Sequence, residues 1–162
     1  MSSHFMKEYF ITDKFTLVPT ALCKPEYLTG LFALDRDESV QSIGLPQFNA
    51  TLLYAANNIE TGKSPLIYKL IDQIESIQEH NKVIIHYSKE LKILQVVAAE
   101  ERKLLLANSF KCHHPNTILY YLTLVCQQVM FNPHLTKISV YGDIESQEEA
   151  LIKKYFQGII FK

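Results

Sequence analysis

The residues with the most evident capacity for chemistry are Cys112, His113 and His114, followed by Cys126 and His134 further along the chain. Thiolate and imidazole groups are the ligands that zinc prefers, and a zinc site needs four of them in a tetrahedral arrangement. Consecutive residues of an extended segment point to opposite sides, so Cys112 and His113 do not readily bind one ion. The spacing also lacks the paired C-x₂-C pattern typical of zinc sites. We therefore expect no metal site here and interpret Cys126 as a small core residue.

Two further motifs suggest nucleophilic or phosphate chemistry. Ser109 could act as a nucleophile with His113 or His114 as its base, but nothing in the sequence fixes a third partner. The segment Gly62-Lys63-Ser64 resembles the end of a phosphate-binding loop but lacks the upstream glycine of that motif. It is more typical of a turn followed by the N-cap of a helix. Neither motif predicts a catalytic site.

The elements that must position any site are clearest from residue 82 onward. Residues 82–87, 91–98 and 102–110 are three β-rich segments, joined by connections of three residues each. Connections this short predict antiparallel hairpins. A helix follows over 116–131, then a strand over 137–141 and a turn at Gly142-Asp143. The sequence predicts a last helix from a capping box at Ser146, and Gly158 as its left-handed cap before a strand over 159–161.

This order, β-β-β-α-β-α-β, predicts an α/β fold with a five-stranded mixed sheet flanked by helices. It is the layout of the ribonuclease H-like fold, whose duplication makes the actin-like ATPases. We expect residues 82–162 to form one complete lobe of this kind.

The first half of the chain is harder to interpret. Residues 1–81 predict a partial N-terminal lobe, with strands near 15–18 and 49–56 and a helix near 65–79, capped by Ser64 with Pro65 at its first position. A short helix from Pro25 to Leu34 and a loop around Gly44 and Pro46 complete the prediction. The two lobes could also form one compact unit.

A ribonuclease H-type nuclease needs carboxylates on the first strand, on the first helix and after the fourth strand, where they hold two metal ions. The helix over 116–131 has no acidic residue, and only Asp143 stands at a required position. The 16 basic and 17 acidic residues also give no field that would attract nucleic acid or an anionic membrane. We therefore exclude the nuclease.

An actin-like ATPase needs a glycine-rich hairpin whose N–H groups approach the phosphates, commonly with Asp-x-Gly. The corresponding segment, 86–91, has neither aspartate nor glycine. If ATP and Mg²⁺ bind, Lys89 would contact a phosphate, Gly142 would lie at the adenosine side, and Asp143 would face the ribose or the metal. Lys89 and Asp143 are more simply explained as turn residues that face solvent, and we favour that interpretation.

Composition limits the class of protein. The 162 residues are 48% apolar and 20% charged, with a net charge of −1, as expected for a globular domain that needs no metal or disulfide to fold. Three cysteines without a CxxC pair favour reduced thiols. The first residues do not resemble a secretory signal, and no apolar run is long enough to span a bilayer. These observations predict a cytoplasmic location.

The segment 104–110, the pair Tyr120-Tyr121 and the segment 140–144 together resemble a domain-of-unknown-function family of Bacteroidetes that is described as actin-like ATPases. That family has a third strand ending in Asn-Ser/Thr-Phe, a helix with a Tyr-Tyr pair and a strand ending in a glycine turn. The resemblance implies a two-lobed bacterial protein similar to actin-like pilus-assembly and cell-division proteins, with nucleotide between the lobes. The chain departs from it at Asn116-Thr117, where the family has an acidic residue, and in its short first lobe.

Together these observations predict a non-catalytic domain with an actin-like ATPase fold, a pseudo-ATPase that binds a protein partner or a second copy of itself. The alternative is an ATP-binding protein with a degenerate phosphate site at Lys89, Gly142 and Asp143. We expect no catalytic residues and no metal ligands.

Overall fold

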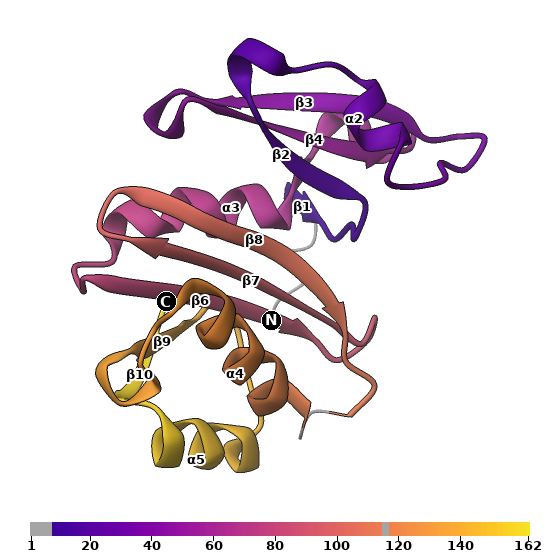
Figure 1. The fold of residues 1–162 in the computed structure, drawn as a ribbon. Coiled ribbons are helices and arrows are strands. Elements are labelled where there is room, and N and C mark those ends of the chain that lie inside the picture. The colour runs from indigo at the N-terminus through magenta and orange to yellow at the C-terminus, as the bar shows by residue number, and fades with distance from the viewer. Residues whose placement is uncertain (1–7, 115–116) are drawn as a thin grey trace. The chain divides into compact units, whose positions relative to one another are not determined.

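The computed structural model describes residues 8–114 and 117–162. They form two compact units, which divide between Lys69 and Leu70 inside the helix α3 (Leu66–Gln73). Each unit has its own sheet (Figure 1). The second unit, Leu70–Lys162, carries all the candidate site residues named above except the turn at 62–64.

A five-stranded mixed sheet with the strand order β10-β9-β6-β7-β8 forms the second unit. The strands β6, β7 and β8 are an antiparallel meander, while β9 and β10 run parallel to β6. This confirms the predicted sheet and the predicted order of elements. The strands are β6 (Asn81–Ser88), β7 (Ile93–Glu100), β8 (Lys103–Lys111), β9 (Lys137–Val140) and β10 (Gly158–Phe161).

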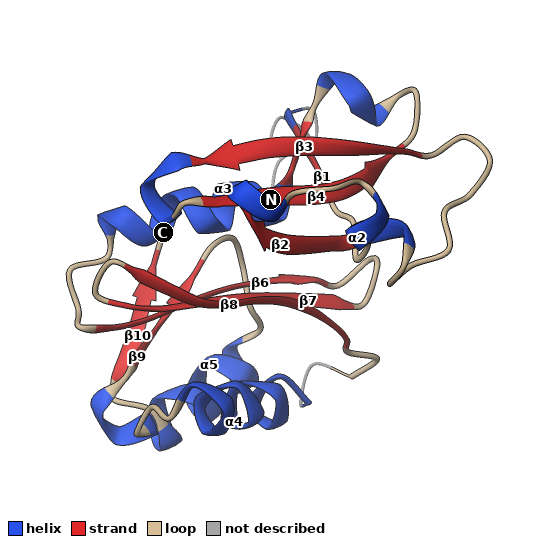
Figure 2. Cartoon of the chain, turned by 45° about the horizontal axis from the view of Figure 1, so that its top comes forward, coloured by secondary structure: helices blue, strands red, loops and turns tan. Residues whose placement is uncertain are grey.

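Both helices of this unit lie on the same face of the sheet (Figures 1 and 2). They are α4 (Ile118–Val129) and α5 (Ser146–Tyr155). Alternate residues of β6, Val83 and Ile85, point into the core between sheet and helices, where they meet Leu122 and Val125 of α4. All four side chains are fully buried. The apolar face of the strand, with its two-residue period, and the apolar face of α4, with its helical period, thus pack together in one layer.

The opposite face of the sheet is also buried but less uniformly apolar. Ile84, Val97 and Ala99 lie there together with the polar residues His86 and Gln95. On the N-terminal side of β6, the 3₁₀ helix η4 (Ile74–Ser76) contacts this strand.

The first unit contains a three-stranded antiparallel sheet with the order β2-β4-β3 and a separate parallel pair, β1-β5. Its core consists of Val18, Leu28, Leu53 and Ala55. The strands are β1 (Tyr9–Phe10), β2 (Phe15–Pro19), β3 (Ser39–Leu45), β4 (Ala50–Ala56) and β5 (Ser64–Pro65), and the short helix is α2 (Glu26–Thr29). Further 3₁₀ helices in the described part of the chain are η1 (Thr20–Leu22), η2 (Pro46–Phe48), η3 (Glu60–Gly62) and η6 (Pro133–Leu135).

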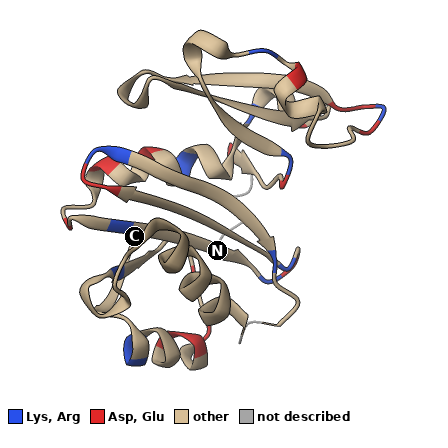
Figure 3. Cartoon of the chain, viewed as in Figure 1, with Lys and Arg blue, Asp and Glu red and all other residues tan. Residues whose placement is uncertain are grey.

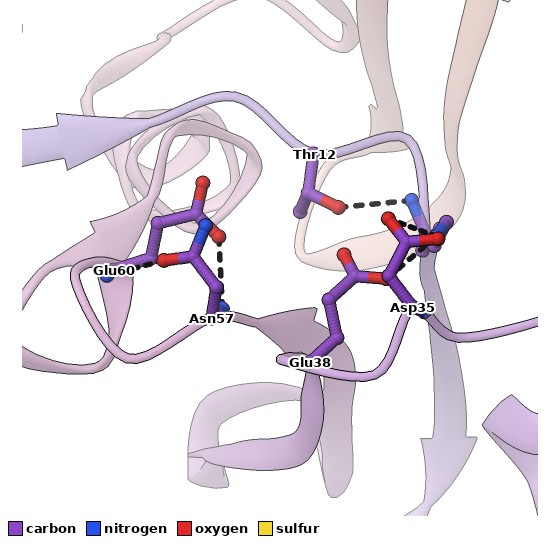
Figure 4. A network of polar contacts seen from close by, with 6 residues as sticks. Thr12, Asp35, Glu38, Asn57 and Glu60 are labelled. Atoms are coloured by element: carbon purple, nitrogen blue, oxygen red, sulfur yellow. Dashed lines mark hydrogen bonds and ion pairs between the residues drawn. The ribbon is translucent and has the colours of Figure 1, made fainter.

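A polar network fixes the loops of the first unit (Figure 4). Lys14 Nζ lies 2.6 Å from Glu38 Oε1 and 3.8 Å from Asp35 Oδ2, and the Asp35 N–H donates to the same Glu38 oxygen. The hydrogen bond to Glu38 raises the pKa of Lys14, although burial opposes it. Burial alone would raise the pKa of Glu38, but the hydrogen bonds from Asp35 and Lys14 lower it. The network ties the start of β2 to the loop before β3.

Several predicted elements of the first unit are wrong in part. The loop predicted around Gly44 is the strand β3, and the helix predicted from Pro25 to Leu34 is only the four-residue α2. Ser64 and Pro65 do not start a helix, because they pair with Tyr9 and Phe10 as β5. The α-helix that follows ends at Gln73, where η4 replaces it.

Two predicted caps in the second unit are also wrong. Ser146 is the first residue of α5 and Glu145 is its N-cap, so no capping box forms. Gly158 is already part of β10, and Gly142 is the described glycine that has a left-handed φ, at 95°. The predicted start of the helix at Asn116 lies outside the described residues. Its predicted end at Phe131 is two residues too long, since α4 ends at Val129.

Met130 is the C-cap residue that follows α4, and it has a left-handed backbone with φ 62°. Glycine adopts this conformation without the steric cost of a side chain, and the Met130 side chain is exposed, so it gives no core contact in return. We expect Met130→Gly to stabilise the chain by about 0.5–1 kcal/mol. Urea unfolding at low micromolar concentration measures this. Gln128→Gly, at an exposed helical position of α4, should instead destabilise by about 1 kcal/mol, and a loss of stability in Met130→Gly would contradict the prediction.

Among the helices in the described ranges, none combines the length and the apolar character needed to cross a membrane.

Candidate functional site

The candidate site lies where two neighbouring parallel strands end. Ile85 of β6 is opposite Val140 of β9, and the Tyr141 N–H donates to the Ile85 carbonyl oxygen at 2.8 Å. Because both strands run in the same direction, the residues after them meet at one edge of the sheet. In open α/β sheets, ligands bind at the carboxyl ends of the strands. The turn with Lys89 and the turn with Gly142 and Asp143 are therefore placed where a ligand site belongs.

Gly142 allows the chain to turn sharply at this edge, because its φ of 95° is a conformation that other residues rarely adopt. Asp143 follows directly and is exposed. Its charge raises the pKa of His86, which partly offsets a larger effect of burial in the opposite direction. Asp143 thus acts on the buried histidine two residues before the end of β6.

Lys89 is already paired with a carboxylate. Its Nζ lies 2.9 Å from Glu145 Oε1, the N-cap residue of α5. Both side chains are largely exposed, so the ion pair contributes little to stability. The pair nevertheless neutralises the one cation that was expected to contact a phosphate.

A second carboxyl group lies close by. Glu148 is buried in the first turn of α5, and burial, together with the charge of Glu145, raises its pKa. Asp143 and Glu145 follow the end of β9 as exposed acidic residues, and the buried Glu148 lies close enough to Glu145 for that charge to affect its pKa. Lys162, whose N–H donates to the Val140 carbonyl oxygen, adds a basic residue at the same edge.

The turn between β6 and β7 is closed by side chains. The Leu91 N–H donates to Ser88 Oγ at 3.1 Å, and Lys92 has a left-handed φ of 55°. Phosphate loops instead leave consecutive backbone N–H groups open towards the ligand, which glycine residues make possible. This turn has no glycine and has used one of its N–H groups internally.

A row of polar side chains crosses the meander and was missed by the sequence reasoning. His86, Gln95 and Ser109 lie directly opposite one another on β6, β7 and β8. His86 and Gln95 are buried, and the buried Ser109 Oγ has no hydrogen-bond partner among the described residues. Burial lowers the pKa of His86 to about 4, so its imidazole is neutral at physiological pH. The sequence signal was a histidine within the apolar run of 83–87.

The cysteine and histidine residues that could have bound zinc are not brought together. Cys112 Sγ lies 2.8 Å from Thr117 Oγ1 and donates to the His114 carbonyl oxygen, while Cys126 lies on the buried side of α4 in the core. Burial raises the pKa of the Cys112 thiol, and that of Cys126 to about 11, which keeps both protonated. Within residues 8–114 and 117–162, no three His, Cys, Asp or Glu residues form a group able to hold a metal ion.

The Tyr120-Tyr121 pair has two different roles. The Tyr121 ring stacks on Phe110 with ring centroids 4.7 Å apart, and its hydroxyl donates to the Lys111 carbonyl oxygen at 2.9 Å. Tyr121 thereby fastens the end of β8 to α4. Tyr120 touches Tyr121 edge to face but is otherwise exposed to solvent.

Comparisons with known proteins agree with this fold. A solved protein with actin-like ATPase fold and unknown function from Bacteroides thetaiotaomicron VPI-5482 is similar, with a TM-score of 0.75 over 94% of this chain at 19% sequence identity. The chain spans 66% of the length of that protein. At this identity the likeness establishes the fold alone, and it confirms the predicted actin-like ATPase fold. No match was found among the curated proteins.

The sequence model of one protein family matches residues 9–159, which is most of the chain. That family is described as a protein of unknown function, DUF3822. The match agrees with the resemblance seen at residues 104–110, 120–121 and 140–144. The chain therefore belongs to the DUF3822 family and has an actin-like ATPase fold.

Proposed function

We propose that this chain is a non-catalytic domain with an actin-like ATPase fold, which acts by binding another protein chain. The observation that carries the proposal is the state of the β6–β7 turn and its surroundings. The turn has no glycine, its Leu91 N–H is occupied by Ser88, and Lys89 is neutralised by Glu145. With its phosphate hairpin closed in this way, the domain still presents outer surfaces on which another protein chain can bind.

ATP binding at a degenerate site is the second candidate. It is favoured by one observation, that Lys89, Gly142 and Asp143 come to the same edge of the sheet at the ends of β6 and β9. Against it stand the ion pair of Lys89 and the acidic groups Glu145 and Glu148 at that edge.

Titration with Mg-ATP separates the two functions. A ligand present at about 100 times its Kd stabilises the native state by about 2.7 kcal/mol, which is a rise in Tm of roughly 5–10 °C for a chain of this size. We expect the Tm to change by less than about 1 °C at millimolar Mg-ATP, because the β6–β7 turn has no glycine and its Leu91 N–H is occupied by Ser88.

A variant identifies the site if the Tm does rise. Lys89→Ala would then reduce the rise, whereas Lys111→Ala, which removes an exposed lysine at the end of β8, would not. That pair of results would replace our proposal with nucleotide binding.

A further inference from the structure

Helix α4 lies in a long stretch of the chain that has no charged residue. From Cys112 to Thr136 the chain contains no Lys, Arg, Asp or Glu, although 20% of all its residues are charged. Figure 3 shows α4 as a helix without a charged residue, beside α5, which carries charges of both signs. The exposed side of α4 and the turn after it form what we call the uncharged surface, made of Tyr120, Leu124, Gln127, Gln128, Met130 and Leu135.

The uncharged surface is not explained by the folding of the chain. Leu122 and Val125 face the sheet and are fully buried, yet Tyr120 and Leu124 on the outer side are 62% and 40% exposed. A surface helix normally carries charged or polar residues on its outer side, and a helix that is apolar on both sides is normally covered on both. The outer side of α4 instead combines exposed apolar residues with uncharged polar ones and carries no charge.

The turn after α4 extends this surface at a cost to the chain. Met130 is 90% exposed and has a left-handed backbone, and Leu135 in η6 is 65% exposed. A long apolar side chain at this position gains nothing from the core and pays both a conformational and a hydration penalty. Methionine is a common residue of binding surfaces, because its flexible side chain adapts to a partner.

The size of the surface suits association between chains. Tyr120, Leu124, Met130 and Leu135 together expose roughly 400 Å² of side chain, within the range of patches that mark interaction sites. A standard interface buries roughly 800 Å² per partner, so these four residues would form the apolar centre of a larger contact.

The charges of the chain indicate which partner fits. A surface without any charge does not repel a copy of itself, and a net charge of −1 puts no long-range repulsion between two chains. The adjacent α5 does carry charges, but its Glu149 and Lys153 already pair with each other at 3.2 Å. A partner with a charged binding surface would leave its charges unpaired here.

We propose, on the basis of the protein-binding function above, that the occupant of the uncharged surface is a second copy of this chain. The two α4 helices pack against each other across a two-fold axis, with Leu124 near the crossing point and Met130 and Leu135 at the ends of the contact. In such an arrangement each substitution acts twice, because both copies contribute the same residues.

Sedimentation velocity across a concentration series up to about 100 µM tests this proposal. The expected result is a concentration-dependent dimer whose dissociation constant rises at least ten-fold in Leu124→Glu, where two carboxylates face each other across the axis. Met130→Glu must weaken the dimer as well, and at 90% exposure it cannot disturb the core. The matched control is Ile59→Glu, an equally apolar, 81% exposed position outside the surface, which should dimerise like the wild type.

A wild-type chain that stays monomeric over the whole series overturns the proposal, and so does a dimer that withstands both substitutions on α4. Neither result bears on nucleotide binding, which the Mg-ATP titration measures separately. A dimer that resists both variants would keep the protein-binding function and remove only its assignment to α4.

Discussion

Acidification from pH 7 to pH 4 is expected to lower the free energy of unfolding by about 3 kcal/mol through His86 alone. Burial lowers the pKa of His86 to about 4 in the folded chain, against 6.5 as its ordinary value. Between pH 6.5 and pH 4, His86 is protonated in the unfolded chain but remains neutral in the folded chain. The contribution of His86 is therefore fully present above pH 6.5 and is lost as the pH falls towards 4.

The measurement is urea unfolding at a series of pH values, with His86→Gln as the comparison. Glutamine keeps a neutral polar side chain at this position and cannot take up the proton. We expect its stability to fall about 3 kcal/mol less than that of the wild type over this pH range. His134→Gln makes the same substitution at an exposed position and serves as the control for removing an imidazole from the chain.

The comparison between variants matters because carboxyl groups also titrate between pH 7 and pH 4. Their protonation stabilises the folded chain in some cases and destabilises it in others. Glu38 has a lowered pKa, so its stabilising contribution also disappears with acid. Glu148 has a raised pKa, mainly from burial, so its protonation favours the folded chain. Both remain in His86→Gln and cancel in the difference. If the stability of the wild type and of this variant changed in parallel with pH, His86 would take up its proton as readily in the folded chain as in the unfolded chain, which would contradict the prediction.

Two leucines of the same helix should respond very differently to the same substitution. Leu122 is fully buried between α4 and the sheet, so Leu122→Ala leaves a cavity and should destabilise the chain by about 3 kcal/mol. Leu124 lies on the outer side, and Leu124→Ala should cost less than about 0.5 kcal/mol in dilute solution. Both substitutions replace leucine by alanine within the same helix. The change in helix propensity is therefore the same and does not contribute to the difference in stability between the two variants.

Chemical unfolding followed by circular dichroism gives both values from the shift in the urea midpoint. Equal losses in the two variants would mean that the outer side of α4 is covered within a single chain. That outcome would also remove the basis of the dimer proposed above. A large loss in Leu122→Ala only would identify Leu124 as a residue that the monomer does not need.

The second unit could be predicted from the sequence because its signals are local. The alternation of β6 and the short connections to β7 and β8 fix the meander, and the apolar stripe of α4 fixes its buried side. Right-handed crossovers then leave few positions for β9 and β10. The meeting of Lys89 with Gly142 and Asp143 at one edge follows from that topology.

The first unit could be predicted less well because its structure depends on pairing between distant residues. β3 is an edge strand in which Leu45 alone is buried, and its Gly44 meets open space rather than a core. Ser64 and Pro65 have the sequence of a helix start, but their pairing with Tyr9 and Phe10 decides their conformation. Local preference was overridden in both cases by contacts that no short window contains.

The polar row of the sheet shows a similar limit. His86, Gln95 and Ser109 become neighbours only when the register of three strands is known, and a shift of one residue would move each of them to the other face. The ion pair between Lys89 and Glu145 likewise depends on where α5 begins. Since the predicted capping box began the helix one residue too late, the partner of Lys89 was not foreseen.

The edge strand β8 of the five-stranded sheet affects how readily one chain can aggregate with another. In the part of the chain that the structure describes, β8 pairs only with β7, so nine residues form an edge whose interior, from Leu104 to Phe110, has no charge. Lysines stand at both ends of it. If two such edges met in antiparallel register, Lys103 of one chain would face Lys111 of the other, and the ammonium groups would repel each other at both ends. We therefore expect these two lysines to oppose the growth of a sheet from chain to chain through β8.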